Sequence, residues 1–382
     1  MDPDGRVLTG AEHEHRVLDA DGVQQDARLL LGDLALAGCR LDPGDPNALR
    51  GPWGGVITAD GREAEIATPP VPLAPDVALQ LEGYLQAGAA ALMAALPDGF
   101  RLDGYSTHLS VGCDDAVVVR AARLYATRLA PAMMLMLDRP ASPGLLVRPR
   151  AARLELGGEF VAGPSFRAAA WFAIATGLAC GRAVRDRRLR RTLPAGRGWN
   201  VETARGRAGW YVDRRAFGCD LYAEGRHAVL GRGRRRVTAQ DLLERTWSVA
   251  RPLVAEQIAP DELGAVDRMV AGDAPLPLEG APVTGAEVPA PKPGPHGELL
   301  TVRERPGFRV EAVVATWHVA VFALTGADGR RVYRPVRAER LAAFLAEVDD
   351  GGLDAVVKAR LAAAQSGTTL ESLDQVRRTS VT

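Results

Sequence analysis

Lysine is almost missing from this chain of 382 residues, and cysteines and aromatic residues are few. Only Lys292 and Lys358 are present, so nearly all the positive charge is carried by arginine, and 47 basic residues balance 47 acidic ones. A chain with no net charge has no overall field to attract nucleic acid or an anionic membrane surface. Neither class of partner is expected, and the runs Arg182–Arg191 and Arg232–Arg236 are interpreted as solvated surface.

The four cysteines, Cys39, Cys113, Cys180 and Cys219, lie far apart and form no Cys-x-x-Cys pair. This spacing argues against a zinc ribbon or a disulfide framework, and favours a reducing compartment. The first residues are polar and acidic, unlike a secretion signal. The longest apolar stretch, Ala168–Cys180, is shorter than the roughly 18 residues that span a bilayer. We therefore expect a cytoplasmic protein.

Proline and glycine are concentrated between Gly272 and Gly297. Such a stretch without helical or strand periodicity is typical of a linker. It divides the chain into a large domain over residues 1–271, a linker over 272–297 and a small α+β domain over 298–382. Helices are predicted at Asp76–Ala95, Asp115–Leu137 and Ser165–Arg187 in the large domain and at Ala338–Val348 and Leu353–Ala364 in the small one, where strands are predicted at Leu299–Val302, Phe308–Thr316, Val319–Leu324 and around Val332.

Four segments of the large domain have the alternation of strands with one apolar and one ionisable face. Because side chains alternate across a strand, residues two apart share a face. Glu12 and Glu14 therefore face one way, Glu63 and Glu65 share a face, and His108 shares its face with Ser110. The predicted strands are Leu8–Leu18, Arg62–Thr68, Tyr105–Gly112 and Arg153–Phe160, the last with Glu155 opposite Leu154 and Leu156.

Carboxylates gathered on one sheet face repel one another and raise one another's pKa. A divalent cation removes this cost, and carboxylate oxygens suit magnesium or manganese, which commonly bridge to nucleotide phosphates. His108 is a candidate ligand for manganese or a contact for nucleotide phosphate. The alternative is that each motif alone belongs to an ordinary solvated face, since Glu-x-Glu occurs often by chance.

Taken in order, these motifs resemble a known family. The matching segments are Thr9-Gly10-Ala11-Glu12-His13-Glu14, Glu63-Ala64-Glu65-Ile66-Ala67-Thr68-Pro69-Pro70, Thr107-His108-Leu109-Ser110-Val111-Gly112 and Arg153-Leu154-Glu155. They are similar to the glutamate-cysteine ligase and carboxylate-amine ligase group, with its amidoligase branches, of the glutamine synthetase-like superfamily. The likeness covers Gly10–Glu159, with weaker support to about Arg268, and does not extend to the small domain.

The resemblance implies an α+β fold in which an antiparallel sheet, backed by helices, forms a cleft for ATP and Mg²⁺ or Mn²⁺. It also implies roles for particular side chains. The metal ligands would be Glu12, Glu14, Glu65 and Glu155; the cofactor-binding residues would be His108 and Ser110; and the catalytic residues near phosphate and substrate would be Arg148, Arg150 and Arg153. The chain departs from the family at Ser110, where a second histidine is usual, and at Glu155-Leu156-Gly157, which lacks the arginine of Glu-x-Arg.

The activity implied by the resemblance is ATP-dependent joining of a carboxylate to an amine through an acyl phosphate. Substrates would be small molecules or peptides. The small domain lies outside the resemblance, and the sequence leaves open whether it serves oligomerisation, presents a protein partner or buttresses the cleft. Two alternatives remain open. Loss of the Glu-x-Arg arginine favours a ligase-fold protein without turnover that acts as a binding or regulatory partner, and one branch of the superfamily cleaves amide or isopeptide bonds instead of forming them.

Overall fold

The computed structural model describes residues 7–34, 36, 39–41, 47–194, 199, 201–204, 208–231, 236–277, 279, 302–337 and 340–364. The predicted strand residues Leu299–Thr301, most of the predicted linker and Arg232–Arg235 of the second arginine run lie outside these residues. None of the helices in the described part of the chain is both long enough and apolar enough to span a bilayer.

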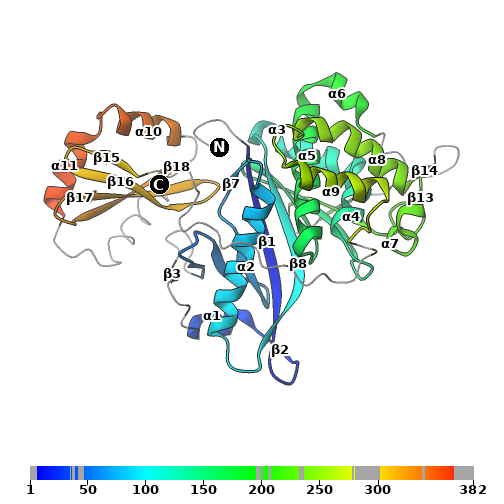
Figure 1. Cartoon of the computed structure of the whole chain (residues 1–382), viewed down its shortest axis with the longest axis horizontal. Coiled ribbons are helices and arrows are strands. Elements are labelled where there is room, and N and C mark those ends of the chain that lie inside the picture. Colours follow the sequence, from blue (N-terminus) through cyan, green and yellow to red (C-terminus); the bar gives the residue numbers. More distant parts are fainter. Residues whose placement is uncertain are drawn as a thin grey trace.

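The fold is α+β, as predicted, and its centre is a twelve-stranded antiparallel sheet. The strands run in the order β11-β12-β9-β10-β8-β1-β6-β5-β4-β3, and β2 and β7 pair with the two ends of β1 (Figure 1). The strands are β1 (Leu8–Leu18), β2 (Gln24–Gln25), β3 (Arg40–Leu41), β4 (Leu49–Arg50), β5 (Val56–Asp60), β6 (Glu63–Ala67), β7 (Val71–Pro72), β8 (Arg101–Gly112), β9 (Gly144–Arg150), β10 (Arg153–Glu159), β11 (Glu202–Thr203) and β12 (Trp210–Asp213).

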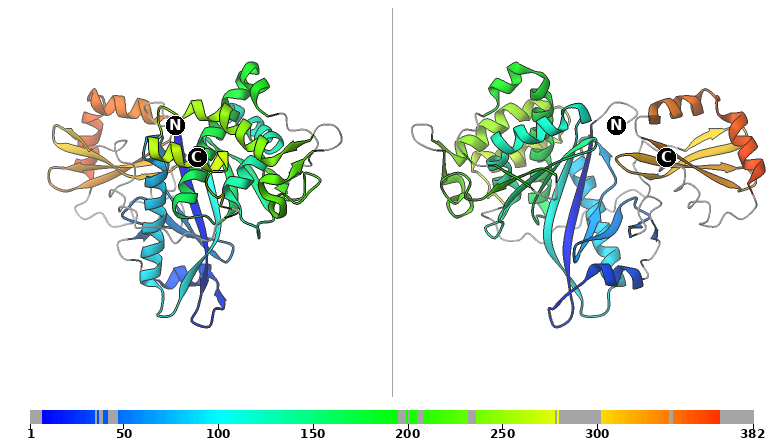
Figure 2. Two further views of the ribbon diagram at one scale, coloured as in Figure 1. Left: turned by 45° about the vertical axis from the view of Figure 1, so that its right-hand side comes forward. Right: turned by 180° about the vertical axis from the view of Figure 1, so that it is seen from behind.

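Helices cover one side of this sheet, which we call the back face (Figures 1 and 2). The helices of the large domain are α1 (Ala27–Asp33), α2 (Val77–Ala95), α3 (Asp115–Arg128), α4 (Ala130–Leu137), α5 (Gly163–Arg185), α6 (Arg187–Thr192), α7 (Leu221–Glu224), α8 (Ala239–Ala250) and α9 (Pro260–Ala271), with short 3₁₀ turns at Gly225–His227 and Arg251–Leu253 and a small hairpin of β13 (Val229–Leu230) and β14 (Val237–Thr238). The middle of the central α5 is buried, and Gly177 lets it approach the strand residue Val111, since an added Cβ would lie 3.1 Å from that side chain. The apolar core therefore lies behind the sheet.

All four predicted polar strands are confirmed as β1, β6, β8 and β10, and they are neighbours in the order β10-β8-β1-β6. The predicted helix over Asp115–Leu137 is two helices instead of one. The break falls at Leu129, which ends α3 and precedes α4, and Pro131 stands in the first turn of α4. Proline has no backbone N–H. It fits the first turn of a helix, where that N–H would have no partner, but in the middle of a longer helix it would remove a backbone hydrogen bond.

Two irregular points shape the sheet. Gly61 adopts φ +65° in the tight turn between β5 and β6, which sets Asp60 opposite Glu63. In β8 the pairing with β1 slips, so that Glu14 faces Ser106 but the next residue of β1 faces Gly104. Tyr105 is the extra residue of this β-bulge, and bulges often redirect a side chain near a functional site.

A second, four-stranded sheet forms the small C-terminal domain, at one side of the large domain in Figure 1. Its elements are β15 (Arg303–Arg305), β16 (Phe308–Ala315), β17 (Val319–Gly326), β18 (Arg331–Arg337), α10 (Leu341–Asp349) and α11 (Asp354–Ala363). The domain has its own core, in which Phe322 packs on Phe344 with ring centroids 4.7 Å apart. The exact domain boundaries stay a prediction, because residues 280–301 are outside the described part.

Candidate functional site

The register of the sheet arranges its polar side chains in rows across the face opposite the helices, which we call the front face. Directly paired residues of antiparallel strands point to the same side. One row holds Arg148, Glu155, Ser110 and Gly10; the next holds Gly157, His108 and Glu12; the third holds Glu159, Ser106, Glu14 and Glu65. The structure thus brings side chains from β9, β10, β8, β1 and β6 onto one surface.

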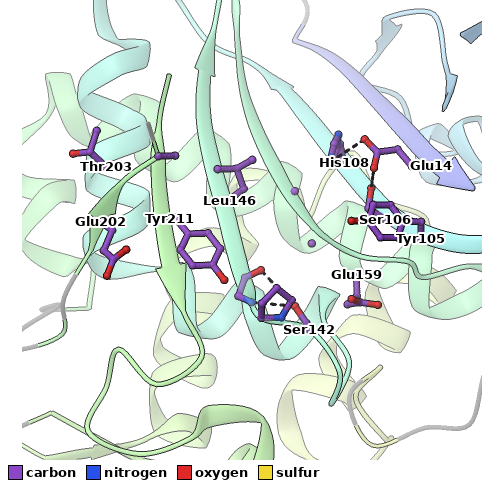
Figure 3. Close-up of a pocket in the computed structure, with 15 residues that line it drawn as sticks. Glu14, Tyr105, Ser106, His108, Ser142, Leu146, Glu159, Glu202, Thr203 and Tyr211 are labelled. Atoms are coloured by element: carbon purple, nitrogen blue, oxygen red, sulfur yellow. Dashed lines mark hydrogen bonds and ion pairs between the residues drawn. The ribbon is translucent and has the colours of Figure 1, made fainter. Parts of the chain in front are cut away.

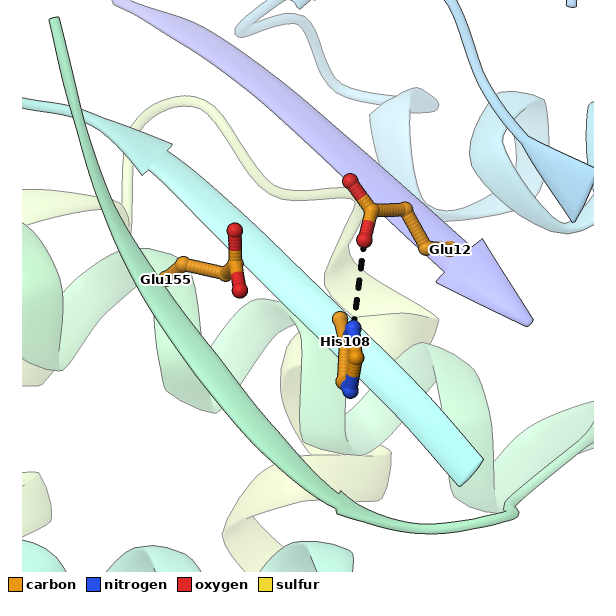
Figure 4. A group of neighbouring side chains, drawn as sticks. All are labelled: Glu12, His108 and Glu155. Carbon is orange, nitrogen blue, oxygen red and sulfur yellow. Dashed lines mark hydrogen bonds and ion pairs between the residues drawn. The ribbon is translucent and has the colours of Figure 1, made fainter. Parts of the chain in front are cut away.

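Glu12, His108 and Glu155 form the first group of possible metal ligands on this face (Figure 4). One ligand atom from each lies within 4.8 Å of the others. His108 Nδ1 is 3.1 Å from a Glu12 oxygen and Nε2 is 3.9 Å from Glu14. Burial alone would lower the pKa of His108, but its hydrogen bond with Glu12 and the nearby carboxylates raise this pKa to about 9. Burial likewise opposes ionisation of Glu12, yet the hydrogen bond and charge of His108, together with the charges of Arg153 and Arg148, outweigh burial and lower the pKa of Glu12. The two form an ion pair.

Glu14, Asp60 and Glu65 form a second group, again with ligand atoms within 4.8 Å of one another. Burial, with the negative charge of Glu12 and its neighbours, raises the pKa of Glu65 to about 8. Burial also raises the pKa of Glu14, which accepts a 2.7 Å hydrogen bond from Ser106 Oγ. These three carboxylates repel one another, and a hard divalent cation takes such oxygen ligands and would neutralise their charge. This donor set therefore fits magnesium or manganese better than the first group.

Arginines gather at the other end of the front face, around Glu155. This carboxylate is 1% exposed and forms ion pairs with Arg148, with Arg150 at 3.1 Å and with Arg153 at 3.8 Å. Arg153 Nε also donates to Ser110 Oγ at 3.2 Å. The three arginines nominated from the sequence are thus together, but the charge of Glu155, nominated as a metal ligand, is already matched by theirs.

The C-terminal domain reaches this arginine end through Trp317. This residue lies in the tight turn between β16 and β17, where Thr316 Oγ1 accepts hydrogen bonds from the backbone N–H groups of His318 and Val319. The guanidinium of Arg153 lies 5.1 Å from the centroid of the Trp317 ring. A Cβ added at Gly10 would come within 3.0 Å of the same ring. The small domain therefore contributes a side chain beside the charged rows.

A cavity of about 450 Å³ opens on the front face beside Glu14 and His108 (Figure 3). Its lining residues come from β1, β8, β9, β10, β11 and β12 and from the loops beside them, and they include Gly157. A Cβ at Gly157 would lie 2.8 Å from the His108 ring, so glycine keeps this part of the cavity clear. The lining residues are Glu14, Tyr105, Ser106, His108, Ser142, Pro143, Gly144, Leu146, Gly157, Gly158, Glu159, Glu202, Thr203, Ala204 and Tyr211.

Two more histidines of β1, His13 and His15, point to the back face. Both are 6% exposed and pack against Phe160, with ring centroids 4.4 and 5.1 Å away. Burial lowers the pKa of His13 well below its usual range and lowers that of His15 to about 4. Both side chains are therefore neutral core residues and lie away from the carboxylate groups.

Sequence reasoning nominated neither Asp60 nor Trp317. Asp60 could have been found by continuing the alternation of Glu63 and Glu65 back through the tight turn at Gly61, because register then places Thr58 and Asp60 on the same face. Trp317 lies more than 150 residues beyond the last matched motif, and no local pattern connects it to β1 or β10. Only the tertiary structure brings it there.

Comparisons with known proteins add little to this geometry. No protein-family model matches the sequence, and neither does any curated protein. Among solved structures, the chain is similar to one titled as the complex between the prokaryotic ubiquitin-like protein Pup and its ligase PafA. That match has 13% sequence identity and a TM-score of 0.42, and it covers 70% of this chain and 65% of the other, less than two thirds of its length. A likeness this weak carries no functional assignment, which depends instead on the residues of the front face.

Proposed function

We propose that this protein is an ATP- and Mg²⁺- or Mn²⁺-dependent carbon–nitrogen ligase that joins a carboxylate to an amine. One observation carries the proposal: a group of carboxylates with the geometry to hold a cation, Glu14, Asp60 and Glu65, lies on the same sheet face as three arginines. Cation and arginines together are the usual means of holding and polarising a nucleoside triphosphate. The motifs that resemble carboxylate-amine ligases supply most of these residues.

In this proposal Glu14, Asp60 and Glu65 would hold the metal. Glu12 lies in the neighbouring row and would add its negative charge. A bound divalent ion would neutralise phosphate charge and fix the orientation of the nucleotide. Glu155 keeps Arg148 and Arg150 in place at the far end of the row. Arg153, which lies 14% exposed between Ser110 and the Trp317 ring, and Arg150, which is 42% exposed, would meet an incoming anion.

The chemistry assigned to the site is the transfer of the γ-phosphoryl group to a substrate carboxylate. A carboxylate oxygen attacks the γ-phosphorus, the bond to ADP breaks, and an acyl phosphate results. The amine nitrogen then attacks the acyl carbon, inorganic phosphate leaves with the bonding electron pair, and the nitrogen loses a proton. Positioning and charge stabilisation are the whole of the protein's task in such a reaction, and no side chain has to act as a covalent nucleophile.

Calorimetry of ATP binding, with and without magnesium or manganese, tests this function. Wild type should bind ATP only with the metal, and folded Glu12→Gln and Glu65→Gln variants should lose that binding. The exposed Glu256, which follows α8 in the chain, gives a matched control as Glu256→Gln and should bind like wild type. Absence of nucleotide binding under any metal would end the ligase proposal.

One observation favours a second candidate, a ligase-fold protein that binds without turnover. The carboxylate of Glu155 is occupied by arginines, and position 157, where the resembled family has an arginine, is Gly157. Metal-dependent ATP binding without ADP formation, across a panel of acids and amines, would support this candidate. Release of an amine from amide or isopeptide substrates would instead support a hydrolase.

A further inference from the structure

A second cavity, of about 240 Å³, is formed in the C-terminal domain by the edge strand β18 and the helix α10 (Figure 1). Three arginines line it, Arg334, Arg337 and Arg340, together with one carboxylate, Glu347. The other lining residues are apolar. An excess of positive charge in a concave site attracts an anion, so this cavity has the character of an anion site.

Other arginines of the same domain have carboxylate partners. Arg303 pairs with Asp349 at 2.9 Å, and Arg305 pairs with Asp354 at 3.1 Å. The three arginines of the cavity differ from these, because none of them forms an ion pair with a carboxylate among the residues that the structure describes. Their guanidinium groups are therefore available to a ligand.

One carboxylate close in the sequence has to be counted as well. Glu339 lies between Arg337 and Arg340 in the chain but outside the described residues. If its full charge is added to that of Glu347, three guanidinium groups still stand against two carboxylates. The cavity therefore keeps an excess of positive charge wherever the side chain of Glu339 lies.

One guanidinium of the cavity is held in place before any ligand arrives. Arg334 is half-buried and lies over the Phe344 ring, 5.0 Å from its centroid. A planar guanidinium stacked on an aromatic ring can still donate two parallel hydrogen bonds to phosphate oxygens. Arg337 and Arg340 are exposed, so an anion reaches them directly from solvent.

We propose that this cavity binds a small phosphate monoester. The phosphoryl group lies among the three arginines, and the organic group lies against Pro335 and Val336. A phosphoryl group with two charges and three acceptor oxygens suits three guanidinium groups better than a single carboxylate does. The volume is below the range of roughly 300–1,000 Å³ that is usual for drug-sized ligands, so the organic group has only a few atoms.

The cavity lies at the end of the small sheet that carries the Trp317 turn. Arg337 pairs with Val319 in the register of β18 and β17, and Trp317 precedes Val319 by two residues. The proposed anion site is thus next to the contact between Trp317 and Arg153, but its lining residues all belong to the C-terminal domain. It does not depend on the proposed ligase function. Arg153 is a competing place for phosphate, so the experiment has to separate the two.

The test is calorimetric titration of the full chain with methyl phosphate, at low salt and about pH 7.5, where the ester is doubly charged. Methyl sulfate has a similar size and a single charge. Methyl phosphate should bind more tightly by about fivefold, the upper scale of one exposed charge pair.

Variants of the lining residues should change this binding in both directions. Arg337→Gln and Arg340→Gln should each weaken it about tenfold, the scale of one charge-assisted hydrogen bond. Glu347→Gln should strengthen it several-fold, because it removes the lining carboxylate. Arg309→Gln, at an exposed arginine of β16 outside the lining residues, is the matched control and should bind like wild type. All four side chains are exposed, so these variants are expected to fold.

Several outcomes would overturn the site. They are absence of methyl phosphate binding at millimolar concentration, equal binding of the two esters, and equal weakening by all three arginine variants, which would indicate a general charge effect. Loss of binding in Arg153→Gln but not in Arg337→Gln would place the phosphate on the front face instead. A blocked phosphoserine tripeptide that binds more than about tenfold more tightly than methyl phosphate would assign the site to a protein-borne phosphate and overturn the small ligand.

Discussion

The two faces of the central sheet shift the pKa of a histidine side chain in opposite directions. His108 on the front face pairs with Glu12, and its pKa rises to about 9. His15 on the back face packs on Phe160, and burial lowers its pKa to about 4. Neither residue type nor depth of burial decides the charge, since both are about equally buried. The group packed against each imidazole decides it: His108 meets the Glu12 carboxylate of the adjacent strand, whereas His15 meets the ring of Phe160, which follows β10.

Among the variants that test this difference between the two faces, the largest effect is expected from removing the Glu155 carboxylate at the arginine end of the front face. Glu155→Ala should lower the free energy of unfolding by roughly 3–5 kcal/mol, because it leaves Arg148, a 6% exposed side chain, without its partner. Urea denaturation measures the loss. Arg150→Ala is the matched control and should cost less than about 1 kcal/mol, since that side chain is 42% exposed.

A second variant distinguishes charge from packing at the same position. In the double change Glu155→Leu with Arg148→Leu, both charges are absent, so stability should return to within about 2 kcal/mol of wild type. If Glu155→Ala itself unfolds at the same urea concentration as wild type, the front face does not depend on this ion pair.

Acid should act first on the back face. A histidine whose folded pKa is below its unfolded value binds its proton in the unfolded state first, so stability is complete above about pH 6.5 and falls as the pH drops toward 4. For His15 the loss is up to roughly 3 kcal/mol. His15→Phe should flatten this part of the stability curve, whereas His227→Gln, at an exposed histidine, leaves the back face intact. An unchanged slope in His15→Phe would contradict the buried neutral state.

The sequence was sufficient for the four polar strands of the central sheet, but it did not predict the eight other strands of that sheet or the contacts between strands. Alternation in β1, β6, β8 and β10 is local, so it predicts which side chains share a face. Register has to come from the turns, and Asp60 was missed because the tight turn at Gly61, which sets Asp60 opposite Glu63, was not used. The pairing of Glu155 with Arg148 is also a register effect, since the two stand opposite each other on β10 and β9. Trp317 depends on domain docking, which no local pattern reports.

The repulsion among the front-face carboxylates predicts a smaller loss of stability, which a bound divalent ion should reverse. The raised pKa of Glu65 means that its ionisation destabilises the fold as the pH rises from about 4.5 to 8. In the presence of a chelator near pH 9, the free energy of unfolding of Glu65→Gln should therefore exceed that of wild type by roughly 1–2 kcal/mol, after allowance for solvent screening. Added Mg²⁺ or Mn²⁺ should stabilise wild type more than the variant. If both respond equally to metal, Glu65 is not a ligand.

The smallest expected effect concerns the contact between the two domains at the front face. Arg153 lies 5.1 Å from the Trp317 ring, and such a contact is worth about 0.5–2 kcal/mol. A double-mutant cycle with Trp317→Ala and Arg153→Gln should give a coupling energy in this range by urea denaturation. The cycle of Arg334→Gln and Phe344→Ala, a 5.0 Å pair inside the C-terminal domain, provides the matched comparison. Coupling within the small domain but none between Arg153 and Trp317 would mean that the two domains do not share the front face in solution; coupling in both would make the C-terminal domain part of the site.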